Sequence, residues 1–286
     1  MTIIKRLPPV HIHPTLYIFM GIAFLTGTFV QLFILFSVVI FHELGHYFMA
    51  LRFKWRVQRV MIWVFGGVME TEEHSNKPVK EDMLVTLAGP FQHLIIYGLL
   101  YLCAAGDYLP RVYIEEIATY NTFILLFNLL PIWPLDGGKL LFCLFSIVFP
   151  YQRGYYTVII WSMLACLVLF AIQLIFFSFN LSFFLLMSFL FMENIKEWKR
   201  RFFVFMRFLL QRYHGKTYVA AVRPLVVGPD ATLMEVFSRF ERNKKHSVYI
   251  TYPGGERRVL DENDCLRGFF HEKLHLKKVG EIAEII

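Results

Sequence analysis

An apolar stretch from residue 15 to residue 51 contains no Lys or Arg, and it limits what this chain can fold into more than any other feature. A single helix of that length would extend about 55 Å at about 1.5 Å per residue. The hydrocarbon core of a bilayer is only about 30 Å thick, so one crossing cannot contain the whole stretch. Because the triplet Thr26-Gly27-Thr28 interrupts it, we expect a short span followed by a full one.

Four further apolar segments are candidates for membrane spans: 83–105, 117–149, 155–177 and 179–195, the second of them interrupted by prolines. Charged residues make up 18% of the chain, compared with about 25% in soluble domains. This composition excludes a soluble globular enzyme and a disordered chain, and the four scattered cysteines exclude a disulfide scaffold. We expect an α-helical polytopic membrane protein of about six transmembrane helices with a small C-terminal α+β domain.

The basic residues predict the orientation of these spans. If the N-terminus is cytosolic, the expected cytosolic segments contain many basic residues, whereas the expected external loops contain Arg111 alone. The cytosolic positions are Lys5, Arg6, Arg52, Lys54, Arg56, Arg59, Lys77, Lys80, Arg153, Lys196, Lys199, Arg200 and Arg201. We therefore expect a multi-pass membrane protein with both termini in the cytosol. The net charge of +7 indicates contact with the lipid bilayer, and no direct nucleic-acid partner is expected.

The composition changes at about residue 217, where the apolar runs shorten and the turn Pro253-Gly254-Gly255 appears. We divide the chain into a membrane domain over 1–195, a basic amphipathic linker over 196–216 and a soluble α+β module over 217–286. The linker is expected to lie along the inner membrane surface.

Short-range signals predict the elements of this module. Asp230 precedes a helical pattern and is the expected N-cap. Residues 247–251 and 257–260 are rich in strand-forming side chains around a turn, and we expect two short strands there.

The chemistry is concentrated in the second span, where His42, Glu43 and His46 form a His-Glu-x-x-His sequence. At a spacing of four residues both imidazoles project from one helix face and can bind one metal ion. Glu43 lies beside the first histidine and can reach a metal-bound water without being a ligand. A carboxylate inside a bilayer costs about 2.5–3.5 kcal/mol on insertion scales, so we interpret these side chains as functional.

A third ligand is needed for a zinc site with an open position, and Asp136 is the only carboxylate within the fourth span. Pro131 and Pro134 break the helix before it, and Gly137-Gly138 allow the backbone to approach closely. The alternative is that Asp136 caps a helix at a kink. Because the second and fourth spans both run from outside to inside, the two motifs are expected at similar depth in the cytosolic half.

These motifs resemble a known family. Phe-His-Glu-Leu-Gly-His at 41–46, followed by Asn-Leu-Leu-Pro-Ile-Trp-Pro-Leu-Asp-Gly-Gly at 128–138, is similar to the site-2 protease family of intramembrane zinc metalloproteases. Phe65-Gly66-Gly67 and Ala88-Gly89-Pro90 agree with it. The resemblance implies that one zinc ion per chain is bound by the histidines and aspartate of these motifs, and that Glu43 is the catalytic residue.

The six spans, the His-Ile-His-Pro sequence at 11–14, the loop at 66–78 and the C-terminal module resemble the bacterial sporulation branch of this family. The tail over 217–286 is similar to a single CBS domain. The resemblance implies a membrane-associated pro-protein substrate, the N-terminal pro-segment of a sporulation sigma factor (pro-sigma-K). It also implies inhibitory membrane partner proteins, ATP binding by the CBS-like module and location in the outer forespore membrane.

A protease that cuts near a membrane must hold its substrate extended. Residues 57–70 are rich in β-branched and aromatic side chains around Gly66 and Gly67, and we expect either a re-entrant hairpin that pairs with the substrate or a loop packed on the bundle. Asn128 is a candidate for hydrogen bonding to the substrate backbone or for bonding between helices. His93 is expected to form an interhelical bond rather than to take a catalytic role.

Three alternative classes of membrane protein share part of this pattern. A membrane metal transporter could use the His and Asp residues for a permeating ion, but it predicts paired repeats that this sequence lacks. A di-iron oxygenase needs several histidine clusters, whereas one pair is present at this spacing. A protease with a Glu as third ligand does not account for the proline-flanked Asp136.

Overall fold

The computed structural model describes residues 10–12, 14–63, 66–71, 77–215, 217–275 and 277–285. The chain divides into two compact units, Met1–His74 with Glu81–Leu140 and Ser75–Lys80 with Leu141–Ile286. Lys5, Arg6, Phe65 and the loop residues 72–76 lie outside the described residues.

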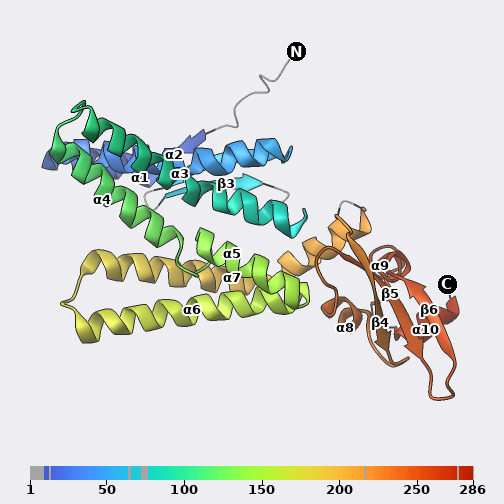
Figure 1. Ribbon diagram of the computed structural model, residues 1–286. Coiled ribbons are helices and arrows are strands. Elements are labelled where there is room, and N and C mark those ends of the chain that lie inside the picture. Colours follow the sequence, from blue (N-terminus) through green and yellow to red (C-terminus); the bar gives the residue numbers. More distant parts are fainter. Residues whose placement is uncertain are drawn as a thin grey trace, which may run out of the picture. The chain divides into compact units, whose positions relative to one another are not determined.

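Four helices build most of the first unit: α1 (Pro14–Thr26), α2 (Phe29–Arg52), α3 (Val79–Ala105) and α4 (Arg111–Asn128). The break expected after Thr26 is confirmed, and Gly27 adopts φ +72° there. Buried aliphatic side chains of α2, α3 and α4 form one core: Val38, Val39, Ile96, Leu100 and Ile124. Figure 1 shows these three helices running beside one another.

A small sheet accompanies α2. It has the order β1 (Val10–Ile12), β2 (Val57–Trp63) and β3 (Gly66–Thr71), with β1 parallel and β3 antiparallel to β2. The structure therefore has the expected hairpin at 57–70 rather than a packed loop. Strand β3 contacts α2, which brings the glycines of the hairpin to the helix that contains the His-Glu-x-x-His sequence.

The expected fourth span is two helices. Helix α4 ends at Asn128 and α5 (Asp136–Val148) begins at Asp136, with turns at 129–135 between them. Pro131 and Pro134 lack the N–H that a continuing helix needs, which accounts for the break. This break places Asp136, the first residue of α5, next to the core of the first unit.

The second unit contains two long helices that pack together, α6 (Tyr151–Phe176) and α7 (Leu181–Tyr213). Helix α7 begins where the Asn180 side chain accepts a hydrogen bond from the N–H of Phe183. It continues without interruption through residues 196–213, so most of the segment expected as a linker is a direct extension of the helix that begins at Leu181.

Among the residues that the structure describes, α2, α3 and α6 are both long and apolar enough to cross a membrane. Large side chains on α6 are exposed, including Trp161 at 51%, Ile175 at 73% and Phe176 at 74%. A surface of this kind is unfavourable in water and is covered when the helices lie in lipid.

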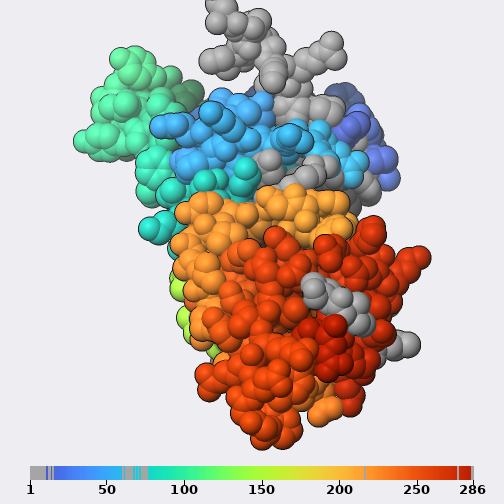
Figure 2. Space-filling view, turned by 90° about the vertical axis from the view of Figure 1, so that its right-hand side faces the viewer, coloured from blue at the N-terminus to red at the C-terminus, as the bar shows by residue number. Residues whose placement is uncertain are grey.

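The C-terminal module is an α+β fold whose sheet has the order β4, β5, β6. Its elements are β4 (Ala221–Val227), α8 (Leu233–Ser238), β5 (Lys244–Thr251), β6 (Arg257–Asp261), α9 (Glu262–Phe270) and α10 (Val279–Ile285). Strand β4 is parallel and β6 antiparallel to β5, and the two expected strands are confirmed. Figure 2 shows the module, from orange to red, as closely packed side chains.

The expected helix cap in this module is wrong. Thr232, not Asp230, caps α8: its hydroxyl accepts from the N–H of Glu235, whose carboxylate accepts from the N–H of Thr232. This reciprocal pair satisfies two backbone donors, which Asp230 two residues earlier cannot reach. Asp230 instead pairs with Lys278 at 2.6 Å.

A buried ion pair joins the end of α7 to the module. Arg212 donates to both carboxylate oxygens of Glu262 at 2.6 and 2.9 Å, and Glu262 also accepts from the N–H of His246 at 2.8 Å. Burial raises the pKa of Glu262, but the hydrogen bonds from His246 and Arg212 outweigh it and lower the pKa to about 2. Because the pKa is depressed, the stabilisation is present above the ordinary pKa of about 4.5 and is lost as the pH falls toward 2.

We expect Arg212→Met to open the module, because Glu262 is then left buried without its main donor. Losing one partner of a buried ion pair costs about 3–5 kcal/mol. The readout is maleimide labelling of the buried thiol of Cys265 in the full chain, with Cys103, Cys143 and Cys166 replaced by Ala. Labelling should be at least about 100-fold faster.

Arg267→Met is the matched control, because Arg267 lies on α9, the helix that contains Glu262, but its side chain is 51% exposed beside Glu272. An Arg212→Met protein that labels no faster than this control would show that the buried pair does not stabilise the module.

Candidate metal centre

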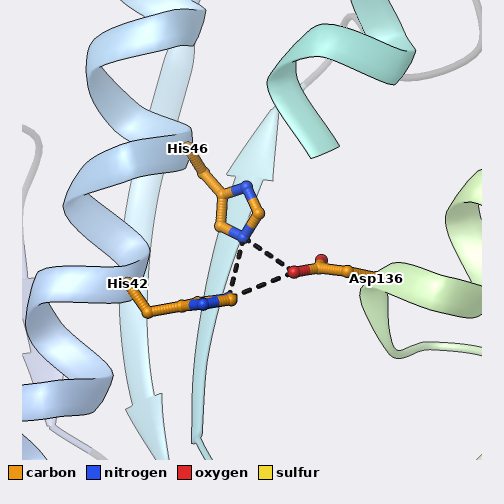
Figure 3. Close-up of side chains that lie close together, drawn as sticks. All are labelled: His42, His46 and Asp136. Carbon is orange, nitrogen blue, oxygen red and sulfur yellow. Dashed lines mark hydrogen bonds and ion pairs between the residues drawn. The ribbon is translucent and has the colours of Figure 1, made fainter. Parts of the chain in front are cut away.

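Three side chains from two separate segments converge in the first unit. His42 and His46 project from one face of α2, and Asp136 is the first residue of α5 (Figure 3). The Nε2 atoms of the two imidazoles are 3.1 Å apart, and each lies 3.1 Å from Oδ2 of Asp136. The three residues are 2%, 5% and 2% exposed, so the three atoms form a buried triangle.

The chemistry of these atoms fits a divalent cation. His46 Nδ1 lies 2.8 Å from the carbonyl oxygen of Val85, so Nδ1 carries the hydrogen and Nε2 presents a lone pair. Asp136 Oδ2 is a buried acceptor without a hydrogen-bond partner. A proton on one imidazole would satisfy one contact and leave two lone pairs facing each other, whereas one cation satisfies all three atoms. Ligand atoms of tetrahedral zinc are about 3.3 Å apart, close to the observed spacing.

Gly89 on α3 makes room at this triangle. A Cβ atom at Gly89 would lie 2.2 Å from His46 Nε2 and 2.7 Å from His42 Nε2, which no side chain can do. The glycine of the Ala-Gly-Pro motif therefore leaves the ligating face of α2 open.

Glu43 and strand β3 border the same site. Glu43, His46, Thr86 and Lys139 are among the residues that line a cavity of about 10 Å³, which is room for about one water molecule. A Cβ atom at Gly67 would lie 2.3 Å from Cγ of Glu43, so β3 passes directly against this side chain. The arrangement brings a carboxylate, a water-sized space and a strand edge to the three atoms of the triangle.

Sequence reasoning missed Lys139. Its Nζ lies 3.1 Å from Oδ1 of Asp136, the carboxylate oxygen that points away from the imidazoles. This contact leaves Oδ2 for the triangle. A lysine three residues after an aspartate in an apolar helix is the signal that could have identified it.

The other predicted site residues are placed as follows. Asn128 is the last residue of α4, and its side-chain Nδ2 donates to the carbonyl of Ile124 at 3.0 Å. Gly66 is opposite Trp63 in the hairpin. His93 forms the expected interhelical bond, and its partner is His42 at 2.9 Å.

Comparison with known proteins agrees with this geometry. The sequence matches the model of Peptidase family M50 over residues 30–109 and 107–172. It is 38% identical over 265 residues to Stage IV sporulation protein FB of Bacillus subtilis, covering 92% of each chain. It is 25% identical over 159 residues to a zinc metalloprotease of Methanocaldococcus jannaschii, covering 51% of this chain and 45% of that protein. The solved structure of the site-2 protease from Methanocaldococcus jannaschii has the same fold, with a TM-score of 0.52 at 21% identity, covering 69% of this chain and 93% of that one.

We expect Gly89→Ala to abolish metal binding while the helices stay folded, because the added methyl occupies the space beside both Nε2 atoms. Gly98→Ala is the matched control on the same helix, since a Cβ there meets nothing within 4 Å. Zinc per purified chain is the measurement, with circular dichroism as the test of folding. Equal zinc content in both variants would refute the proposed role of Gly89.

Proposed function

The chain belongs to peptidase family M50 and is a site-2-type metalloendopeptidase of the membrane, and we propose that His42, His46 and Asp136 bind its zinc ion and that Glu43 is its catalytic base. The observation that carries this proposal is the buried triangle of Nε2, Nε2 and Oδ2 atoms with 3.1 Å sides. One divalent cation would satisfy all three atoms at once, which supports this assignment.

In this proposal different side chains have different roles in peptide hydrolysis. When bound, zinc supplies Lewis-acid chemistry that polarises the scissile carbonyl and acidifies water. Glu43 accepts a proton from the attacking water and returns it to the amine that leaves. Lys139 holds Oδ1 of Asp136 so that Oδ2 remains directed at the imidazoles.

The hairpin supports a way to present the substrate. A helical substrate keeps its carbonyls in its own hydrogen bonds, so the scissile segment must first be extended. In the described part of the chain β3 is strand-paired with β2, and we propose that an extended substrate segment adds to its other edge. We assign Gly66 and Gly67 to this edge, because glycines let a second backbone approach Glu43. Asn128 is assigned to hydrogen bonding with the substrate backbone.

The similarity to Stage IV sporulation protein FB over 92% of both chains supports the substrate class that we propose. The protein would remove the membrane-associated N-terminal pro-sequence of a sporulation sigma factor, pro-sigma-K, in the outer forespore membrane. Inhibitory membrane partner proteins would restrain it.

The membrane topology is part of the same proposal. The membrane domain over 1–195 crosses the bilayer six times with both termini cytosolic, which the distribution of basic residues supports. The segment 196–216 leads to a CBS-like module over 217–286 that binds ATP.

We expect Glu43→Gln to retain zinc and to lose cleavage, because the amide cannot accept the proton. Asp136→Ala should lose both zinc and cleavage. The measurement is co-expression with pro-sigma-K, with processing followed on gels and zinc measured in each purified protein.

Two outcomes of this experiment would contradict the proposal at different points. Full processing by Glu43→Gln would remove Glu43 from the mechanism. Retention of zinc by Asp136→Ala would remove Asp136 from the metal site.

We expect Gly67→Ala to reduce turnover at least about 10-fold with unchanged zinc content, because the methyl displaces Glu43 and blocks the strand edge. Gly98→Ala is again the control, because it adds the same methyl group at a position where a Cβ atom meets nothing within 4 Å. Wild-type turnover in Gly67→Ala would show that β3 does not position Glu43 or the substrate.

A further inference from the structure

A chain of buried polar side chains leads away from the metal centre through three helices. His42 Nδ1 on α2 lies 2.9 Å from His93 Nε2 on α3, and His93 Nδ1 lies 2.7 Å from Asn121 Oδ1 on α4. Asn121 Nδ2 donates back to the carbonyl oxygen of His93 at 3.2 Å. The three residues are 0–2% exposed, so water does not compete for these bonds.

We propose that His93 and Asn121 are positioning residues that fix the ring orientation and tautomer of His42, so that its Nε2 lone pair points at the metal. The inference deepens the proposed function and rests on His42 being a zinc ligand. It adds two residues from other helices to the metal centre without giving them contact with substrate or metal.

The donor and the acceptor can be assigned for each hydrogen bond in the chain from His42 through His93 to Asn121, which we call the relay. The carbonyl of His93 can only accept, so the amide group of Asn121 is oriented with its nitrogen toward that carbonyl and its oxygen toward the His93 ring. Asn121 Oδ1 can only accept, so His93 Nδ1 carries the hydrogen, and in the neutral ring His93 Nε2 is then an acceptor. His42 Nδ1 must then carry a hydrogen, which leaves the lone pair on Nε2.

The two imidazoles of the centre are therefore held in different ways. His46 Nδ1 bonds to a backbone carbonyl, that of Val85, which side-chain substitution cannot remove. His42 depends on side chains from α3 and α4. Residues that hydrogen-bond to metal-bound histidines typically contribute about 10–100-fold to metal affinity. For His42 this contribution comes from side chains, which a substitution can remove.

The test compares zinc affinity in the full purified chain, measured by competition with a chelator, for His93→Leu, His93→Gln and Asn121→Leu. We expect about 10–100-fold weaker binding in His93→Leu and a smaller loss in Asn121→Leu. His93→Gln should recover most of the affinity, because its side-chain oxygen can accept from His42 Nδ1.

Cobalt substituted for zinc gives a second readout, since its visible absorption reports ligand geometry. We expect altered bands in His93→Leu and wild-type-like bands in His93→Gln. A purely structural role for His93 would lower stability without this difference between the two variants.

Tyr97→Phe is the matched control. Tyr97 bonds to Thr122 at 2.6 Å, which is another hydrogen bond between α3 and α4 but lies outside the relay on an exposed face. This variant should bind zinc with wild-type affinity. If Tyr97→Phe weakens zinc binding as much as His93→Leu, general helix packing explains the effect and the relay is refuted.

His42→Ala separates failure of the relay from failure of the proposed function. Retention of zinc by His42→Ala would overturn the metal assignment itself. Loss of zinc in His42→Ala together with wild-type affinity in both His93→Leu and Asn121→Leu would overturn the relay alone. Because the two relay variants lie on different helices, misfolding of one leaves the other as the test.

Discussion

Three atoms with lone pairs face one another at 3.1 Å in a site that water barely reaches, and the first unit is organised around this contact. With no proton or metal ion between them these atoms repel, so the surrounding protein must hold them together. The break before Asp136 supplies the oxygen, Gly89 supplies the space, and the outer nitrogens of both imidazoles are already bonded. The packing of the helices therefore keeps these three mutually repelling atoms close together.

The sequence allowed the centre to be predicted because membrane spans contain few polar residues. His42 and His46 share a helix face at any depth, and Asp136 stands out as a carboxylate between helix-breaking prolines. The hairpin at 57–70 and strands β5 and β6 of the module also follow from local composition, whereas β4 was not predicted. Family membership then identifies the enzyme class, and it disfavours the transporter.

What could not be predicted depends on contacts between distant segments or on competition between neighbouring signals. Asp230 and Thr232 are both good caps, and only the reciprocal bond of Glu235 decides between them. The continuation of α7 beyond residue 196 is stabilised at its end by Arg212 and Glu262, which are 50 residues apart. The contacts that Lys139 and His93 make can be identified only when α3, α4 and α5 are placed against α2.

The most direct test of the account is zinc X-ray absorption on the purified full chain. We expect one zinc ion per chain with two imidazole nitrogens and carboxylate oxygen at about 2.0–2.2 Å, and loss of bound zinc when His42 or Asp136 is replaced by Ala. A zinc ion with sulfur ligands at about 2.3 Å, or zinc that persists in both variants, would contradict it.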